Sequence, residues 1–302
     1  MQVYADNAAT TRMHQTAIDT MTYHLNHTFG NPSSLYTIGQ EAKEVLETAR
    51  ADMAACFGAQ PREIYFTSGG SEADNQAITS AAYLGARIIS TTFEHHAVLH
   101  TLKRLEKQGF EVTLLDVHAD GLVTAQQVAD AIRDDTCLVT IMFANNEIGT
   151  IQPIQEIGAV CKEKGVLFHT DAVQAAGHVK IDVNAMNIDM LSLSAHKFHG
   201  PKGVGMLYAR RGIILTNLIE GGAQERGKRG GTENVPGIAA MAAALKEACA
   251  NMDENTKKVT ALRDKLIDGI AKIPHCALNG ARSPRLPGNV NFCFEGIEGE
   301  SL

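Results

Sequence analysis

Short apolar runs alternate with helical patterns from residue 63 to residue 209, and this alternation constrains the fold more than any other feature. Runs such as 138–143 are almost continuously apolar, as in strands buried on both faces of a sheet. We therefore predict an α/β fold with a doubly wound, mainly parallel, seven-stranded sheet. The predicted strands are 63–67, 87–93, 111–116, 137–144, 166–171, 190–196 and 203–209, with helices at 71–84, 95–108, 125–133 and 154–164.

The segments on either side of this alternation predict further helices. Helical spacing of apolar residues indicates an amphipathic helix at 39–57, which Gly58 ends, and residues 13–27 are compatible with another. A longer helical pattern runs from 235 to about 272, with a break near 252–255.

The domain organisation follows from where these patterns change. We predict a large domain over residues 1–250, whose residues 1–15 pack with a smaller domain. That smaller α+β domain begins at 251–302 and is incomplete within the chain. It contains a strand pattern at 289–294.

Composition and charge exclude several classes of protein. The net charge of −7 does not favour a nucleic-acid partner or an anionic membrane surface. No apolar run approaches the roughly 20 residues that span a bilayer, and the first residues do not resemble a signal peptide. The six cysteines are scattered without a Cys-x-x-Cys pair, which predicts reduced thiols in a cytoplasmic protein.

The most informative residue is Lys197, at the end of the predicted strand 190–196. In doubly wound sheets, ligands bind beyond the carboxyl ends of the strands. Lys197 follows Ser194 and His196 and precedes a Gly-Pro-Lys-Gly turn. A structural ion pair is the alternative, but this setting favours a chemical role for the amine.

A second strand end predicts an anion site. The segment Ser68-Gly-Gly-Ser opens a helix, where free N–H groups and the helix dipole favour a negative ligand. Ordinary capping is an equally good interpretation, because Ser71 and Asp74 have capping-box spacing. The segment has neither the phosphate-loop nor the dinucleotide-binding pattern, so a nucleotide is not favoured.

Histidines follow the strand pattern 87–93. His95 could stack on a flat ligand or move protons. His96 and His100 are four residues apart on a helix, a spacing that can bind metal. No further ligand completes that set, so a solvated helix face is favoured and we predict no metal site.

Polar residues also end two central strands. Asn145 and Asn146 are either turn formers or ligands for a substrate, and the sequence leaves both readings open. Asp171 ends an apolar strand, where a carboxylate needs a partner to offset its desolvation. The alternative for Asp171 is a helix N-cap.

One ligand would use all these groups. Pyridoxal phosphate has a phosphate for the anion site, a flat ring for the histidine, a ring nitrogen for the aspartate and an aldehyde that forms a Schiff base with lysine.

These motifs resemble the cysteine desulfurases, which are class-V aminotransferase-like enzymes of the fold type I pyridoxal phosphate group. The similarity runs through the whole chain. Its main segments are Asp6-Asn-Ala-Ala-Thr-Thr, Thr67-Ser-Gly-Gly-Ser-Glu-Ala-Asp-Asn, Glu94-His-His-Ala-Val, Asn145-Asn-Glu-Ile-Gly, Asp171-Ala-Val-Gln, Ser194-Ala-His-Lys and Arg229-Gly-Gly-Thr-Glu-Asn.

The resemblance implies a role for each matching residue. Lys197 would form the Schiff base, and His95 would stack on the ring and help to move protons. Asp171 would bind the ring nitrogen, Gln174 the ring hydroxyl, and Asn146 both substrate and cofactor. Thr232 would reach the phosphate of a neighbouring subunit, which implies a homodimer. The phosphate would be held by Gly70, Ser71, Ser194 and His196.

The implied reaction converts L-cysteine to L-alanine and passes sulfur to an enzyme cysteine, for iron–sulfur cluster assembly or tRNA thiolation through an acceptor protein. None of the six cysteines has the sequence context of the family's nucleophile, and Cys293 is expected to be a buried, inert thiol. The alternatives are a related pyridoxal phosphate aminotransferase or lyase, and an inactive cofactor-binding scaffold.

Overall fold

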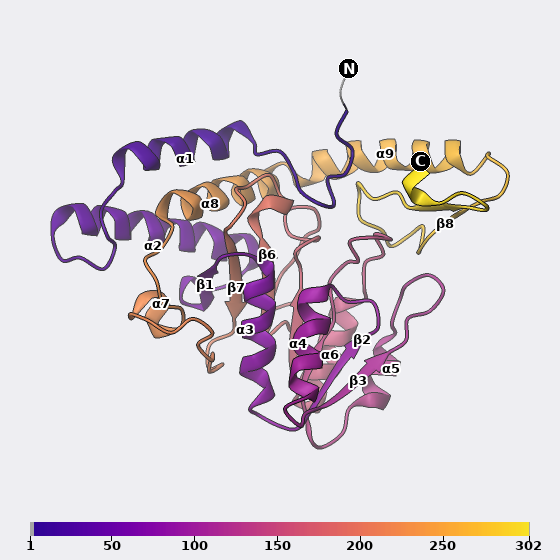
Figure 1. Ribbon diagram of the computed structural model, residues 1–302, viewed down its shortest axis with the longest axis horizontal. Helices are drawn as coiled ribbons and strands as arrows, with labels where there is room; N and C mark the ends of the chain where they lie inside the picture. The colour runs from indigo at the N-terminus through magenta and orange to yellow at the C-terminus, as the bar shows by residue number, and fades with distance from the viewer. Residues whose placement is uncertain (1–2, 302) are drawn as a thin grey trace.

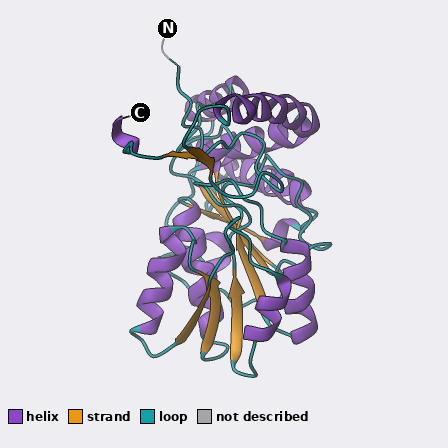
Figure 2. Cartoon of the chain, turned by 90° about the vertical axis from the view of Figure 1, so that its right-hand side faces the viewer, coloured by secondary structure: helices purple, strands orange, loops and turns teal. Residues whose placement is uncertain are grey.

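The computed structural model describes residues 3–301 and contains the seven-stranded sheet that the sequence predicts. Helices cover both faces of this sheet (Figures 1 and 2). All seven predicted strands are present. They are β1 (Ile64–Thr67), β2 (Arg87–Thr91), β3 (Glu111–Leu115), β4 (Thr136–Thr140), β5 (Leu167–Asp171), β6 (Met190–Ser194) and β7 (Gly205–Ala209).

The strand order is β1-β7-β6-β5-β4-β2-β3. Strand β7 pairs antiparallel with both β1 and β6, and the other neighbours are parallel. The mainly parallel, doubly wound prediction is therefore confirmed. The carboxyl ends of β2, β4, β5 and β6 consequently meet at one edge of the sheet.

The predicted helices also form, and two apolar clusters attach them to the sheet. One cluster lies beneath α3 and α4, and the other includes residues of α2, α6 and α8. The break predicted near 252–255 occurs at Asn251, between α8 and α9. The helix bounds are α1 (Gln15–His27), α2 (Thr37–Phe57), α3 (Gly70–Ala82), α4 (His96–Glu106), α5 (Ala125–Ala131), α6 (Ile154–Lys164), α7 (Gln224–Gly227), α8 (Val235–Ala250) and α9 (Met252–Ile270).

A small sheet follows α9 and lies apart from the main one (Figure 1). It pairs β8 (Cys276–Leu278) with β9 (Phe292–Phe294). The sequence predicted the second of these strands only. The expectation that Cys293 is buried was wrong, because its side chain is exposed. Strand β9 has one partner strand, and only the face that carries Phe292 and Phe294 is partly buried, whereas Cys293 points to the other face.

No helix within residues 3–301 is both long enough and apolar enough to cross a membrane.

A buried ion pair joins elements that are far apart in the sequence. The guanidinium of Arg50 on α2 binds both carboxylate oxygens of Glu225 on α7, each at 2.8 Å. Only 5% and 2% of these side chains is exposed. Glu225 also accepts the N–H of Phe66 on β1, and Arg50 donates to the carbonyl of Ile64. The pair therefore attaches the 220–230 segment to the sheet.

We expect Glu225→Ala to lower the free energy of unfolding by about 3–5 kcal/mol, because it leaves the Arg50 charge buried without a counter-ion. Glu47→Ala is the matched control. It removes the partner of Arg50 that is 56% exposed, and should cost less than about 1 kcal/mol. Urea denaturation of both variants measures the difference, and equal losses would contradict the assigned importance of the buried pair.

Candidate functional site

A cavity of about 510 Å³ lies at the carboxyl edge of the sheet, where β5 and β6 end. It brings together nearly all the candidate residues. Thr232 is the exception, since it is exposed and is not among the residues that line the cavity. The predicted residues in the cavity wall are Gly70, Ser71, His95, Asn146, Asp171, Gln174, Ser194, His196 and Lys197.

Lys197 lies in a short 3₁₀ turn, Ala195–Lys197, directly after β6. Its amine donates hydrogen bonds to the backbone carbonyls of Ala8 and Ala9. Burial lowers the pKa of Lys197, and the carboxylate of Asp171 only partly offsets this effect. A lowered pKa makes the neutral, nucleophilic amine more accessible near neutral pH.

The N-terminal segment forms one wall of the cavity, a role that its composition did not indicate. Asp6, Ala8 and Ala9 line the space beside the lysine. Gln174 donates to the Ala8 carbonyl at 3.0 Å. Thr11 donates both its N–H and its hydroxyl to the carbonyl of His196, so the segment is fixed to the turn that carries Lys197.

The amino end of α3 lies at the cavity, where the sequence predicts an anion site. The helix begins at Gly70, so its first N–H groups have no helical partner and face the cavity. A Cβ at Gly70 would lie 2.6 Å from Cγ2 of Val173, so any larger residue at this position would have to displace the Val173 side chain. The capping-box alternative for Ser71 and Asp74 was wrong, because Gly69 is the N-cap and no side chain caps it.

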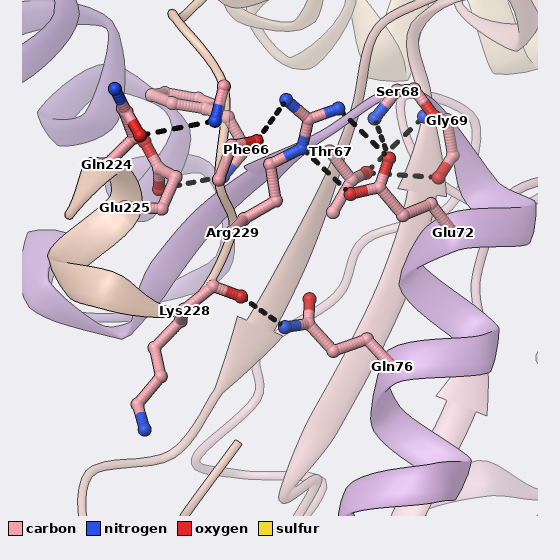
Figure 3. A network of polar contacts seen from close by, with 12 residues as sticks. Phe66, Thr67, Ser68, Gly69, Glu72, Gln76, Gln224, Glu225, Lys228 and Arg229 are labelled. Atoms are coloured by element: carbon pink, nitrogen blue, oxygen red, sulfur yellow. Dashed lines mark hydrogen bonds and ion pairs between the residues drawn. The ribbon is translucent and has the colours of Figure 1, made fainter. Parts of the chain in front are cut away.

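Glu72 and Arg229 hold this end of the site in place (Figure 3). Glu72 accepts the N–H of Ser68 at 2.7 Å and Nε of Arg229 at 3.0 Å. Burial alone would raise the pKa of Glu72, but the hydrogen bonds from Arg229 and Ser68 outweigh it and lower the pKa. The carboxylate therefore stays ionised and ties the 228–231 segment to the start of α3.

The opposite end of the cavity is acidic. Asp171 is 5% exposed, and its Oδ1 accepts the N–H of Val173 at 2.9 Å. A turn rather than a helix follows, so the helix N-cap alternative was wrong. Burial raises the pKa of Asp171, while the Val173 N–H and the charges of His95 and Lys197 lower it.

His95 lies opposite Asp171 at the start of α4. Its Nδ1 accepts the N–H of Ala97 at 3.1 Å, so in the neutral form of the ring the proton is on Nε2. His96 and His100 are exposed on α4, as expected for a solvated helix face. A ring nitrogen of His95 and one oxygen each of Asp74 and Asp171 lie within 4.8 Å of one another, a spacing that could also accept a metal ion. The lysine and the anion site in the same cavity fit an aldehyde that carries a phosphate better.

The two asparagines after β4 differ in their contacts: Asn145 bonds to backbone groups, and Asn146 lines the cavity. Asn145 is buried, accepts the N–H groups of Glu147 and Ile148, and donates to the Phe93 carbonyl. Asn146 lines the cavity. The turn-forming interpretation therefore applies to Asn145, and the position of Asn146 allows contact with a ligand.

Sequence reasoning missed two buried acids: Asp74, which lines the cavity, and Glu94, which is not among the lining residues. Glu94 accepts the Thr91 hydroxyl at 2.6 Å and the Met142 N–H at 3.0 Å, and so joins the loop before His95 to the end of β4. An acid flanked by an apolar strand and a histidine pair was the only indication of it in the sequence.

Comparison with known proteins agrees with this geometry. The Aminotransferase class-V family model matches residues 3–302. "Cysteine desulfurase IscS" of Methanosarcina thermophila is 54% identical over 99% of this chain and 75% of that protein. "Putative cysteine desulfurase IscS 1" of Bacillus subtilis is 47% identical over all of this chain and 81% of that protein.

Solved structures give the same result. A "NIFS-LIKE PROTEIN" superposes with a TM-score of 0.97 at 39% identity, over 100% of this chain and 84% of that one. "SspA in complex with cysteine" has a TM-score of 0.79 at 44% identity, over 81% and 72%. The chain therefore belongs to the class-V aminotransferase family and, within it, to the cysteine desulfurases.

The buried Glu94 predicts a pH-dependent stability. Burial raises its pKa from 4.5 to about 8, so the folded chain retains a proton that the unfolded chain releases as the pH rises above 4.5. The contribution of the protonated Glu94 to the free energy of unfolding is therefore complete below about pH 4.5 and is lost as the pH rises towards 8. Relative to Glu94→Gln, the wild type should lose about 2–4 kcal/mol of stability between about pH 5 and pH 8.

Urea denaturation of both proteins across this range checks the expectation. Glu106→Gln, which changes an exposed glutamate on α4, is the control and should show a pH-independent difference from the wild type. A pH-independent difference for Glu94→Gln as well would contradict the protonated state assigned to Glu94.

Proposed function

We propose that this cavity binds pyridoxal 5′-phosphate, with Lys197 as the residue that forms the Schiff base. The juxtaposition of the Lys197 amine, the Asp171 carboxylate and the amino end of α3 in one cavity is the observation that carries the proposal. When bound, the cofactor supplies an electron sink for a carbanion at the substrate α-carbon. Asp171 would hold the ring nitrogen, and its negative charge would favour the protonated, electron-withdrawing form of that nitrogen.

The remaining residues fit the parts of the cofactor in the same orientation. The phosphate would lie against the N–H groups of Gly70 and Ser71, with Ser194 and His196 beside it. A second hollow of about 450 Å³ adjoins this end and shares these four residues. Gln174 would contact the ring hydroxyl, and Asn146 the ring and the substrate.

The chain is proposed to act as a cysteine desulfurase that converts L-cysteine to L-alanine. Lys197 Nζ can take the α-proton of the substrate, because the same lowered pKa that favours imine formation favours a neutral amine. Nε2 of the neutral His95 ring carries a proton that it could exchange with the substrate, because His95 lines the cavity. The 54% identity to a named cysteine desulfurase supports this substrate over that of other class-V enzymes.

The sulfur would pass to a cysteine thiolate as a persulfide. Of residues 3–301, those lining the cavity include no cysteine. Burial raises the pKa of Cys161 to about 12, which disfavours its thiolate. We therefore propose that the accepting thiol is brought to the cavity rather than built into its wall. An acceptor protein for iron–sulfur cluster or tRNA thiolation chemistry would then receive the sulfur, in the cytoplasm.

The proposal includes a homodimer in which Thr232 of one chain contacts the phosphate held by the other. Its exposed position and the hollow beside the anion site support this arrangement. We further propose the division into a large domain, 1–250, and the start of a smaller one, 251–302.

Replacement of the lysine tests the cofactor assignment. Mixed with pyridoxal phosphate and with a small-molecule thiol that accepts the sulfur, the wild type should show the visible absorbance of the lysine-bound cofactor and should form alanine from L-cysteine. Lys197→Ala should lose that absorbance and reduce alanine formation by about 10³-fold or more. Lys180→Ala, which changes an exposed lysine outside the cavity, is the control. An unchanged absorbance spectrum in Lys197→Ala would refute the assignment.

Light scattering tests the dimer. We expect twice the mass of one chain for both the wild type and Thr232→Ala. The variant should bind pyridoxal phosphate about tenfold more weakly, because it loses a hydrogen bond to a charged group. A monomer with full cofactor affinity, or unchanged affinity in the variant, would exclude the role of Thr232.

A further inference from the structure

A row of buried polar groups extends from the acidic end of the cavity, where Asp74 lines it beside Asp171, to His169 and Ser192. Asp74 is on α3, one turn after Gly70, and α3 packs across the central strands. His169 and Asp171 are two residues apart on β5 and so face the same side of the sheet, towards α3. The side chains of Asp74, His169 and Ser192 are each 1% exposed or less.

Asp74 has an incomplete set of partners. Its Oδ1 is buried and finds no hydrogen-bond partner within residues 3–301. The nearest ring nitrogen, Nε2 of His169, is 3.7 Å away and is occupied by the Ser192 hydroxyl at 2.9 Å. The other ring nitrogen contacts Thr140 at 2.8 Å. His169 therefore offers no counter-ion, and burial lowers its pKa to about 3.

The charges around Asp74 make ionisation costly. Burial raises the pKa of Asp74 well above its ordinary value and the nearby Asp171 raises it further, whereas the Ser192 hydroxyl lowers it only in part. Oxygens of the two carboxyls lie within 4.8 Å of each other, a separation at which two buried carboxylates cannot both ionise readily. This proximity favours a proton on one of the two carboxyls.

We propose that Asp74 is a positioning residue for Asp171: it remains a carboxylic acid, so that Asp171 carries the negative charge held against the cofactor ring nitrogen. The inference rests on the proposed function for the identity of that cofactor. A protonated Asp74 can donate a hydrogen bond to the Asp171 carboxylate, and its place on α3 links the anion site to the acidic end. Both ends of the cofactor would then be held by one helix.

Whether Asp74 is protonated can be tested in the protein without the cofactor. In infrared difference spectra of the cofactor-free protein at neutral pH, wild type minus Asp74→Asn should contain the carbonyl band of a protonated carboxylic acid. Carboxylate bands in its place would overturn the proposal. This readout does not depend on activity or on cofactor binding, so it stands even if the protein binds no pyridoxal phosphate.

The positioning role is tested by pyridoxal phosphate affinity. Asp74→Leu, which cannot donate, should raise the dissociation constant about tenfold or more, whereas Asp74→Asn keeps an N–H donor and should stay within about threefold of the wild type. Thr79→Val removes another buried polar group of α3 away from the cavity and should have no effect. If Asp74→Asn binds as weakly as Asp74→Leu, or if Asp74→Leu binds like the wild type, the role is wrong. Should Asp74→Leu fail to fold, the infrared band and the affinity of Asp74→Asn still decide the question.

Discussion

The parallel pairing of β2, β4, β5 and β6 is the constraint on which the site depends. Parallel strands that share a register end at the same edge, so residues more than a hundred positions apart become neighbours there. His95 follows β2, Asp171 ends β5 and Lys197 follows β6. A change of one residue in register would turn Asp171 towards the opposite face of the sheet. The backbone hydrogen bonds between these strands, rather than contacts of the three side chains themselves, therefore bring the site together.

Desolvation is the second determinant, and it acts differently at the two ends of the cavity. At the α3 end, Glu72 is stabilised as an anion by Arg229, and the free N–H groups of the helix remain available for a ligand. At the other end, Asp74, Glu94 and Asp171 are buried close together, and burial raises the pKa of each. Because buried carboxyls of this kind favour their neutral forms, the acidic end carries less negative charge than its residue count indicates.

The sequence predicted the helices, the strands and most of the residues that line the cavity better than it predicted the buried contacts between distant segments. His95, Asp171 and Lys197 could be found because each is a polar residue at the end of an apolar strand. Asp74 could not be found in this way, since on a helix its spacing from Ser71 fits a capping box equally well. The pair of Arg50 and Glu225 spans 175 positions, and no local pattern relates the two residues. Strand β8 and the exposure of Cys293 depend on a two-stranded sheet whose three-residue strands are too short for alternation to be recognised.

The opposite character of the two ends explains why the cavity would hold a ligand in one orientation. A phosphate at the α3 end contacts the first N–H groups of the helix and the positive end of its dipole. At the other end, the negative charges of the phosphate and of Asp171 would repel each other. A protonated ring nitrogen has the reverse preference. With both ends fixed, the atoms between them are presented to Lys197, whose amine is held by the carbonyls of Ala8 and Ala9. The N-terminal segment therefore matters for orientation: its carbonyls hold the lysine amine, and its own hydrogen bonds to the His196 carbonyl keep that arrangement independent of the ligand.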